Sequence, residues 1–311
     1  MRKSTPKFLG FRGNVILPDQ TSLQFNYELQ EKSGYKNSIF CKVFLKVKDC
    51  NRISTKIRGR MYYLYFVKQF DENIYQYKLV KKASIKKHDL GEADITESQI
   101  DDYPYIHIFV HLHSQKLLIE LNESIFSDYM YSKVVLEKLI NSELSPDESC
   151  IKLVPITDEM KFWSFIENNS YGICEVDFSL KAPNFLDGGS AAEDFLREFE
   201  NKTKSTSVDL KLSNEEAGLS LKRENIDSFV KYASSGAGEW TIKKKTANGK
   251  TETIKSKDKC RKVSLPVSME HLKKGIVNII TLKNAFNRIE TIKKFMEENN
   301  VEGEQGKNDK E

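Results

Sequence analysis

The chain has 311 residues, of which 39% are hydrophobic and 30% are charged, and its formal net charge is +4 at pH 7. A chain of this length can bury a substantial core, in one large domain or in two smaller ones. The composition excludes a largely disordered protein, and no window contains the roughly 20 apolar residues that a membrane-spanning helix needs. The basic N-terminus lacks the apolar stretch of a signal peptide, so we expect a soluble, cytoplasmic protein.

The five cysteines show neither a CxxC pair nor regular spacing; they are Cys41, Cys50, Cys150, Cys174 and Cys260. Most of them have apolar or strand-like neighbours. This pattern is typical of reduced thiols that pack as small hydrophobic groups in a cytosolic protein.

Residues 1–145 are predicted to form a β-rich domain, because apolar, β-branched and aromatic residues alternate with polar ones along much of this part. The acidic segment 91–102 is expected to be a surface loop. A helix at 127–141 ends before Pro146, where we place the domain boundary. Strands are predicted for residues 39–47, 60–70 and 74–80, and a hairpin for residues 105–121.

Residues 146–300 are predicted to form a second domain, a mixed antiparallel sheet with packed helices. Thr157 or Asp158 can cap a short helix that ends at residue 166, and Gly188-Gly189 is expected to form a turn. Ser190 and Glu193 form a capping box at the start of another helix, whose apolar residues repeat at helical spacing. Further strands are predicted for 150–156, 172–182 and 207–212, and a further helix for 225–233. The fold class is therefore predicted to be α+β.

A long helix is predicted for residues 269–298, followed by a disordered tail at 301–311. Its apolar stripe is too long for a small domain to cover easily, which makes it a candidate subunit interface of a homodimer. The alternative is that the stripe packs within the monomer. The stripe consists of Leu272, Ile276, Ile279, Leu282, Phe286, Ile289, Ile292 and Met296.

Residues 239–262 are predicted to form a basic β-hairpin. Asn248-Gly249 lies between two arms that carry threonine and isoleucine, and this dipeptide is typical of a two-residue turn with positive φ at both positions. A lysine-rich ribbon can contact a phosphate backbone. The alternative is an ordinary solvated hairpin whose lysines protect an edge strand from aggregation.

Basic residues also concentrate at 42–60, with Asp49 as the single acid, and at 78–87 with no acid. Such segregation creates local fields that a near-neutral total conceals. The aromatic stretch 61–66 follows the first basic cluster. Aromatic rings on a basic sheet can stack with single-stranded bases, but an alternating strand of this kind is more often half core and half surface, and we favour a core role.

Other motifs that could carry chemistry have competing explanations. His107, His111 and His113 share one face of a predicted strand with Phe109, and three imidazoles could bind zinc. No carboxylate or cysteine stands beside them at ligand spacing, so an ordinary polar strand face is the alternative, and we assign no metal site and no cofactor.

Two loose motif matches lie in the wrong structural context. Pro146-Asp147 with Glu159-Met160-Lys161 matches a metal-dependent nuclease pattern, but at a turn and a helix start rather than on adjoining strands. Gly249-Lys250-Thr251 ends like a P-loop, yet Lys244 stands where that motif needs glycine. We therefore assign no catalytic residues.

The order of segments resembles the RexA-like phage-exclusion proteins and related antiphage proteins over residues 103–295. The resemblance is carried by YPYIHIFVHLHSQKLLIELN, CIKLVPITDEMKFWSFI, GICEVDFSLKAPNF, SVDLKL, the basic hairpin and the terminal basic helix. It implies a dimeric protein that binds duplex DNA with little sequence preference, senses phage infection and triggers exclusion with a membrane partner. It transfers no enzymatic residues.

The sequence thus predicts a cytoplasmic, sequence-nonspecific nucleic-acid-binding protein, with duplex DNA as the expected ligand, that acts in phage defence, exclusion or abortive infection. A membrane or other effector protein is a possible further partner. One alternative is a metal-dependent nuclease or hydrolase using the three histidines or Glu175 and Asp177, and another is a protein-interaction subunit without DNA binding. The predicted nucleic-acid-binding residues are Lys243, Lys244, Lys245, Lys250, Lys255, Lys257, Lys259, Arg261, Lys262, Lys42, Lys46, Lys48, Arg58 and Arg60.

Overall fold

A computed structural model describes residues 5–17, 29–90, 94–145, 149–169, 172–183, 190–216, 218–246 and 248–290. The strands are β1 (Lys7–Ile16), β2 (Arg52–Ile57), β3 (Arg60–Gln69), β4 (Ile74–Lys81), β5 (Ala83–Leu90), β6 (Ile95–Asp102), β7 (Tyr105–His111), β8 (Lys116–Glu120), β9 (Cys150–Pro155), β10 (Ile173–Lys181), β11 (Ser207–Ser213), β12 (Gly238–Lys245), β13 (Thr251–Lys255) and β14 (Lys262–Ser264). The helices are α1 (Leu29–Asp49), α2 (Tyr129–Asn141), α3 (Glu159–Asn168), α4 (Ala191–Thr203), α5 (Arg223–Tyr232), α6 (Met269–Lys273) and α7 (Ile279–Glu290).

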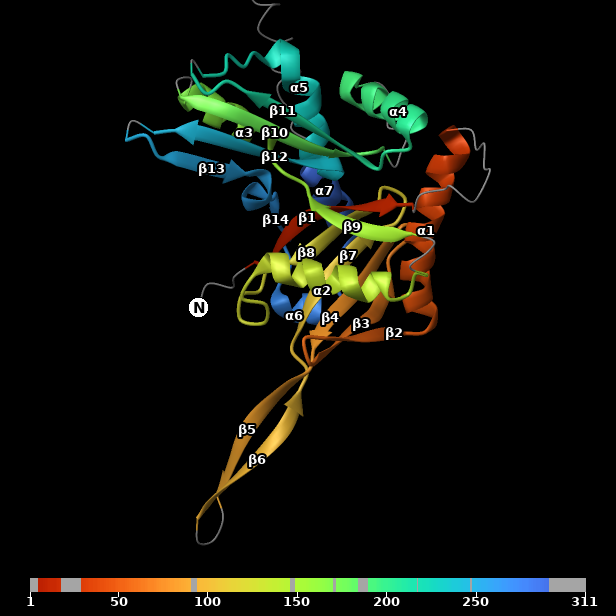
Figure 1. Ribbon diagram of the computed structural model, residues 1–311. Coiled ribbons are helices and arrows are strands. Elements are labelled where there is room, and N and C mark those ends of the chain that lie inside the picture. The colour runs from red at the N-terminus through yellow and green to blue at the C-terminus, as the bar shows by residue number, and fades with distance from the viewer. Residues whose placement is uncertain are drawn as a thin grey trace, which may run out of the picture.

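The first sheet has the strand order β14-β1-β8-β7-β4-β3-β2, and β9 also pairs with β1 (Figure 1). All pairings in this sheet are antiparallel. One edge of β1 pairs with β8. Its other edge pairs with β14 over Lys7–Leu9 and with β9 over Phe11–Ile16. β1 is therefore an interior strand along most of its length.

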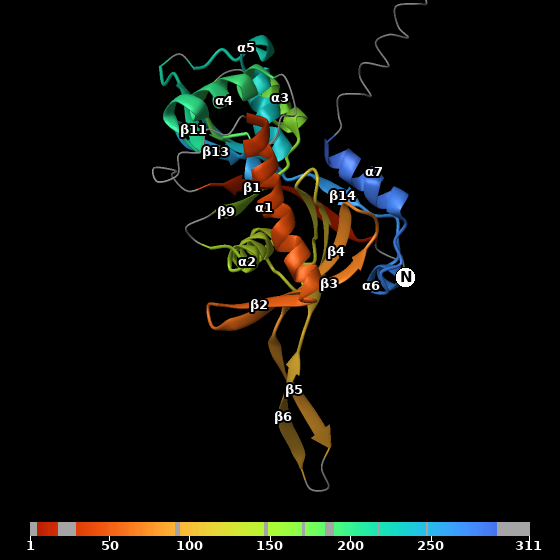
Figure 2. The ribbon, with the colours of Figure 1, turned by 90° about the vertical axis from the view of Figure 1, so that its right-hand side faces the viewer.

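Both faces of the first sheet carry helices, which Figure 2 shows on opposite sides. Helices α1 and α2 pack on one face, where residues such as Phe44 and Leu136 are fully buried. Helices α6 and α7 cover part of the other face, where Phe286 and Phe109 belong to the same buried cluster. We call the cluster beneath α1 and α2 the first core and the cluster beneath α6 and α7 the second core. Successive side chains of a strand point to opposite faces, so Ile108 lies in the first core and Phe109 in the second.

The second sheet has the order β11-β10-β12-β13 and carries α3, α4 and α5 on one face. Its core includes Phe162, Phe178 and Trp240, whose rings lie 5.2–6.0 Å apart. A single π-helical turn at Ala233–Ala237 joins this unit to the first sheet. There the Asn14 side chain donates to the Gly236 carbonyl oxygen at 2.9 Å, and the Thr157 amide donates to the Ser234 carbonyl oxygen at 2.9 Å.

Strands β5 and β6 form a two-stranded arm that projects away from the rest of the molecule (Figures 1 and 2). Every residue of β6 is exposed. The prediction of a loop for residues 91–102 was wrong for 95–102. The pairing of β6 with β5, rather than a hydrophobic face, produces the strand, so its polar composition gave no β signal.

The α+β class is confirmed, as are the strands near 60–70 and 74–80 and the hairpin of β7 and β8. The predicted caps Asp158 and Ser190 are also confirmed: each accepts a hydrogen bond from a backbone amide in the first turn of α3 and α4. Asp128, which was not predicted, caps α2 in the same way. The predicted turn at Gly188-Gly189 and the motif residues Pro146-Asp147 lie outside the described residues.

Residues 39–47 belong to α1, and the prediction of a strand there was wrong. Ile39, Phe40, Val43, Phe44 and Val47 are all buried, and this spacing is that of one helical face. Their β-branched and aromatic character favoured a strand. Burial of the helical stripe against the first sheet outweighs that weak local preference.

The single long helix predicted for 269–298 was also wrong over its described part, because the chain breaks between α6 and α7. Gly275 has a φ of +69°, a left-handed conformation that interrupts a right-handed helix. The stripe residues Leu272, Leu282, Phe286 and Ile289 are buried within the chain, whereas Ile279 is half-buried and Ile276 is 56% exposed. Ile292 and Met296 lie outside the described residues.

The hairpin of β12 and β13 exists, but its connection differs from the predicted two-residue turn. Lys245 pairs with Thr251, and the Thr246 amide donates to the Lys250 carbonyl oxygen at 2.8 Å, so a longer loop links the strands. A two-residue turn occurs instead between β2 and β3. Arg58 and Gly59 both have positive φ there, at 48° and 82°, and Ile57 pairs with Arg60.

The predicted boundary at residue 146 does not separate the two sheets. Strands β9 and β14 follow it in sequence, yet both pair with β1. Among the described residues, no helix is long and apolar enough to cross a membrane.

Gly13→Ala is expected to lower the free energy of unfolding by about 1–3 kcal/mol, because overpacking a full core forces neighbours to shift. A Cβ at Gly13 would lie 2.3 Å from the Phe40 ring of α1. Gly34→Ala is the control: no atom lies within 4 Å of a Cβ there, and alanine in a helix should raise stability by about 0.5–1 kcal/mol. Urea unfolding of both variants measures the difference, and equal effects would contradict the packing of α1 on β1.

Candidate nucleic-acid interface

The predicted lysines of β12 interact with other parts of the protein. Lys243 Nζ lies 2.6 Å from a carboxylate oxygen of Glu175 on the neighbouring strand β10. Lys244 donates to the Asn169 side chain, and Lys245 Nζ donates to the Glu215 carbonyl oxygen at 2.9 Å. Contact with a phosphate would compete with these interactions, so we expect the three lysines to contribute less to anion binding than their sequence suggests.

Glu175 is buried between two lysines on neighbouring strands of the second sheet. Lys211 Nζ on β11 is 2.9 Å from its second carboxylate oxygen. Hydrogen bonds from Lys211 and Lys243 lower the pKa of Glu175 below its ordinary value. An ionised carboxylate with two cationic partners stabilises the cross-strand arrangement, and its oxygens are already occupied.

Five lysines that follow β12 have no carboxylate partner among the described residues. We call them the lysine segment. They lie on the hairpin loop, on β13, on the 3-10 turn Ser256–Lys259 and on β14, and the segment extends from the second sheet to the edge of the first (Figure 1). Three of them are exposed and the other two are half-buried. The lysine segment consists of Lys250, Lys255, Lys257, Lys259 and Lys262.

Arg261 stands within this run but has a structural role. Its guanidinium donates to the carbonyl oxygens of Arg288 at 3.3 Å and Ile289 at 2.9 Å, near the end of α7. It also lies 3.8 Å from Asp158, and its side chain is only 12% exposed. A cation at a helix C-terminus satisfies carbonyl groups that have no partner within the helix. Sequence alone could not separate this arginine from its basic neighbours.

The basic cluster predicted at 42–60 is divided by the fold. Lys42, Lys46 and Lys48 lie on α1, where Lys46 pairs with Glu143 at 2.8 Å and Lys48 donates to Gln69 at 3.0 Å. Arg58 and Arg60 lie instead at the turn between β2 and β3. The lysine segment and this turn are on different parts of the molecule, so the fold does not merge the two predicted basic regions (Figure 1).

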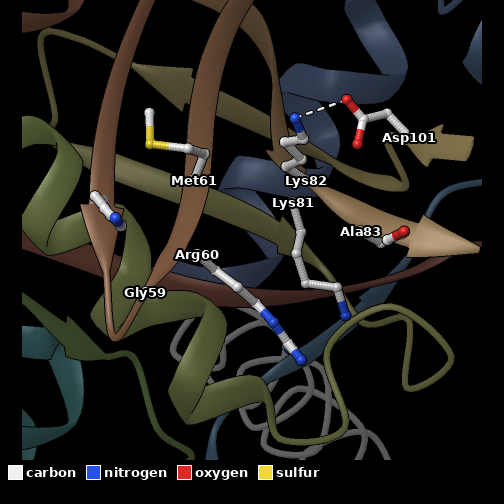
Figure 3. Close-up of a pocket in the computed structure, with 9 residues that line it drawn as sticks. Gly59, Arg60, Met61, Lys81, Lys82, Ala83 and Asp101 are labelled. Carbon is white, nitrogen blue, oxygen red and sulfur yellow. Dashed lines mark ion pairs between the residues drawn. The ribbon is translucent and has the colours of Figure 1, made fainter. Parts of the chain in front are cut away.

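Arg60 borders a cavity of about 600 Å³ at the base of the arm (Figure 3). Four cationic side chains line this cavity against a single carboxylate. Its lining residues are Lys56, Gly59, Arg60, Met61, Lys81, Lys82, Ala83, Ser84 and Asp101. We call it the cationic pocket.

The cations of the cationic pocket differ in how they are held. Lys82 Nζ forms an ion pair with Asp101 at 2.6 Å, and Lys81 Nζ donates to the Ile125 carbonyl oxygen at 2.8 Å. Lys56 and Arg60 form no ion pair with a described residue. In Figure 3 the ends of Arg60 and Lys81 point the same way, while Lys82 turns toward Asp101. The pocket therefore carries excess positive charge and can accept an anion.

Lys81 and Lys82 belong to the acid-free basic run 78–87, and neither was among the predicted binding residues. The turn at Arg58-Gly59 brings Lys56 and Arg60 beside this run, because β2, β3 and β4 are neighbours in the sheet. Pairing of strands, which the local sequence does not specify, creates the cluster.

The three histidines do not form a metal site. His107 is buried and its Nδ1 lies 3.0 Å from the Gln76 amide nitrogen, His111 packs against Phe286 with 5.5 Å between ring centroids, and His113 lies beyond the end of β7. Within the described ranges, no group of three or more histidine, cysteine or carboxylate side chains could hold a metal ion. Asp177 forms no ion pair with a described residue.

His107 should make the protein less stable as the pH falls. Burial lowers the pKa of His107 to about 4, and the charges of Lys78 and Lys273 add to the effect. In the unfolded chain its pKa is about 6.5, so between about pH 6.5 and pH 4 the unfolded state binds a proton that the folded state does not. This residue alone should reduce the free energy of unfolding by about 1.4 kcal/mol per pH unit in that window.

Urea unfolding of His107→Gln should therefore show a shallower loss of stability across this pH range than the wild-type protein. His88→Gln, at an imidazole that is 59% exposed, is the control. Parallel pH profiles for wild type and His107→Gln would contradict a neutral buried His107.

Comparisons with known proteins assign the chain to a family, but they do not identify an activity. No curated protein and no solved structure matches the chain. The model of one family, described as "Domain of unknown function (DUF4747)", matches residues 47–289. This match extends from the end of α1 to the last turn of α7 and includes both the cationic pocket and the lysine segment. The chain therefore belongs to the DUF4747 family.

Proposed function

We propose that this protein binds nucleic acid through its phosphate backbone, with little dependence on base sequence. The lysine segment is the observation that carries the proposal: five lysines close in sequence, each without a carboxylate partner among the described residues. Unpaired lysines that lie close together attract phosphate and release the counterions condensed around nucleic acid. Paired lysines such as Lys243 would gain less, because they exchange one anionic partner for another.

The chemistry of these side chains favours backbone contact over base readout. Lysine is a flexible point charge, whereas specific recognition of base edges typically uses bidentate groups such as arginine, asparagine or glutamine. The lysine segment contains no such bidentate side chain, and the neighbouring Arg261 already donates hydrogen bonds to carbonyl oxygens at the end of α7. We therefore infer that duplexes of unrelated sequence are bound alike.

The resemblance to RexA-like proteins supports a role in phage defence or exclusion. On this proposal, DNA binding would be the sensing step, and a membrane or other effector protein would act downstream. In the homodimer implied by the resemblance, the buried stripe residues Leu272, Leu282, Phe286 and Ile289 would not be part of the interface.

Binding should depend steeply on salt concentration and barely on sequence. We expect fluorescence anisotropy with two unrelated duplexes to give equal affinities at each salt concentration, with log K falling linearly as log salt rises. The slope of log K against log salt concentration should be about −0.9 for each phosphate that the protein neutralises. A strong preference for one duplex, or no binding at low salt, would contradict backbone recognition.

Substituting Lys250, Lys255 and Lys257 with glutamate should weaken binding to both duplexes equally and reduce the magnitude of the salt slope by about one per lysine. The matched control changes Lys202, Lys222 and Lys274 to glutamate. The side chains of these lysines are 60–71% exposed, and each lysine forms an ion pair with a nearby glutamate, namely Glu198, Glu224 and Glu270 respectively. Both triple variants change the net charge equally, so similar losses would show that only net charge matters and would remove the lysine segment from the proposal.

A further inference from the structure

A row of tyrosines lies on a part of the first sheet where none of the described helices packs. Helices α6 and α7 cover the second core around Phe109 and Leu118, but the outward residues of β2 and β3 are not part of that core. Tyr63, Tyr65 and Tyr105 are half-buried, and Tyr103 is 46% exposed. Their neighbours in β3, Tyr62 and Leu64, point to the opposite face and are fully buried. The aromatic strand is thus half core and half surface.

The exposed rings lie close enough together to act as one surface. The Tyr63 ring centroid is 6.1 Å from that of Tyr65 and 6.2 Å from that of Tyr103. Tyr105 belongs to the same face, because Tyr63 pairs with Val80 and Val80 with Tyr105 across three neighbouring strands. We call Tyr63, Tyr65, Tyr103 and Tyr105 the tyrosine face.

Two cations on the tyrosine face are held by rings and not by carboxylates. The Arg52 guanidinium lies 5.8 Å from the Tyr65 ring centroid and donates to its hydroxyl at 2.9 Å. Lys78 Nζ lies 4.3 Å above the Tyr105 ring. Neither cation forms an ion pair with a described residue. Such contacts hold the cations in place while leaving their charge unneutralised.

The tyrosine face is continuous with the cationic pocket. Met61, which lines the pocket, is two residues from Tyr63 on the same side of β3, a separation of about 7 Å along a strand. The Lys82 amide donates to the Met61 carbonyl oxygen at 2.9 Å, so the two lining segments are joined directly. A surface of rings therefore ends at a cavity with excess positive charge.

Cross-strand stabilisation alone would account for tyrosine–cation pairs on a sheet. It does not account for their position beside the cationic pocket, where Lys56 and Arg60 have no anionic partner. Accessible rings next to unneutralised cations are the two components of a surface that binds single strands, in which rings stack with bases and cations contact the backbone.

We propose that the tyrosine face and the cationic pocket together bind single-stranded nucleic acid, with phosphates at Lys56 and Arg60 and bases stacked on Tyr63 and Tyr103. A duplex fits this surface poorly, because its bases already stack on one another and present no free faces. The proposal goes beyond duplex binding by the lysine segment and does not depend on it, since the two sets share no residue.

Fluorescence anisotropy with two oligonucleotides of equal length and charge tests the proposal. One is a single strand of 20 thymidines, and the other is a 20-unit abasic deoxyribose-phosphate chain. The wild-type protein should bind the thymidine strand about ten-fold more tightly, because only that strand can stack. Equal affinity for the two chains would overturn the proposal, and so would no binding of either at low salt.

Variants locate the effect. Tyr63→Leu with Tyr103→Leu should abolish the difference between the two oligonucleotides, while Tyr35→Leu should preserve it. Tyr35 is the matched control because it lies on α1 and is 46% exposed, as Tyr103 is. If the double variant does not fold, Tyr103→Ala alone should still reduce the difference, because Tyr103 lies outside the strands. An undiminished difference in the folded tyrosine variant would overturn the proposal.

The pocket cations and the lysine segment are tested separately. Lys56→Gln with Arg60→Gln should weaken binding of both oligonucleotides and reduce the salt slope, whereas Lys202→Gln with Lys274→Gln should not. The tyrosine variants should leave duplex affinity unchanged. Loss of duplex binding in the lysine-segment variant, with the thymidine preference intact, would separate the two proposals. Unchanged binding in the Lys56/Arg60 variant would overturn the assignment of the pocket.

Discussion

The hydrogen-bonding of β1 is the constraint on which the rest of the molecule depends. This strand begins near the N-terminus, yet it pairs with β8 on one edge and with both β9 and β14 on the other. Each pairing satisfies backbone groups that would be costly to bury alone. Because β9 and β14 come from the second half of the chain, β1 makes the two halves one folded unit. Removing it would leave β8, β9 and β14 with unpaired edges.

The same strand also determines how closely the helices approach. Gly10 and Gly13 lie on opposite faces of β1, next to Ile289 of α7 and Phe40 of α1 respectively. A side chain at either position would occupy space that these residues fill. The tight packing holds α1 on the first core and α7 on the second, and α7 in turn holds Arg261 at its end. Because the packing of β1 fixes α7, and α7 binds the Arg261 side chain, this arginine is not part of the exposed basic surface.

The surface charge of the protein follows from which cations find carboxylates. On the second sheet, Glu175 takes both Lys211 and Lys243, so a region that is strongly basic in sequence is partly neutralised in the fold. At the base of the arm the opposite occurs: four cations meet one carboxylate around the cationic pocket. Since isolated surface ion pairs contribute little to stability, their main effect here is on the field that a ligand meets.

Elements whose signals are local could be predicted from the amino-acid sequence. The caps Asp158 and Ser190, the alternating strands β3, β4 and β7, and the α+β class followed from spacing and side-chain chemistry. The lysine-rich hairpin was also recognisable, because its charge and its flanking strands are contiguous. These features depend on neighbours within a few residues, where propensity, capping and alternation act directly.

Features that depend on residues far apart in the chain became visible in the folded structure alone. Residues 39–47 became helix because their buried stripe packs on the first sheet, and 95–102 became strand because β5 pairs with them. The cationic pocket exists because β2, β3 and β4 are adjacent, and Lys243 is neutralised because β10 places Glu175 opposite it. Such contacts join residues far apart in the chain, so no window of sequence contains both partners. The sequence therefore determined which side chains are cationic and which segments alternate, and the fold alone decided which cations remain without a carboxylate.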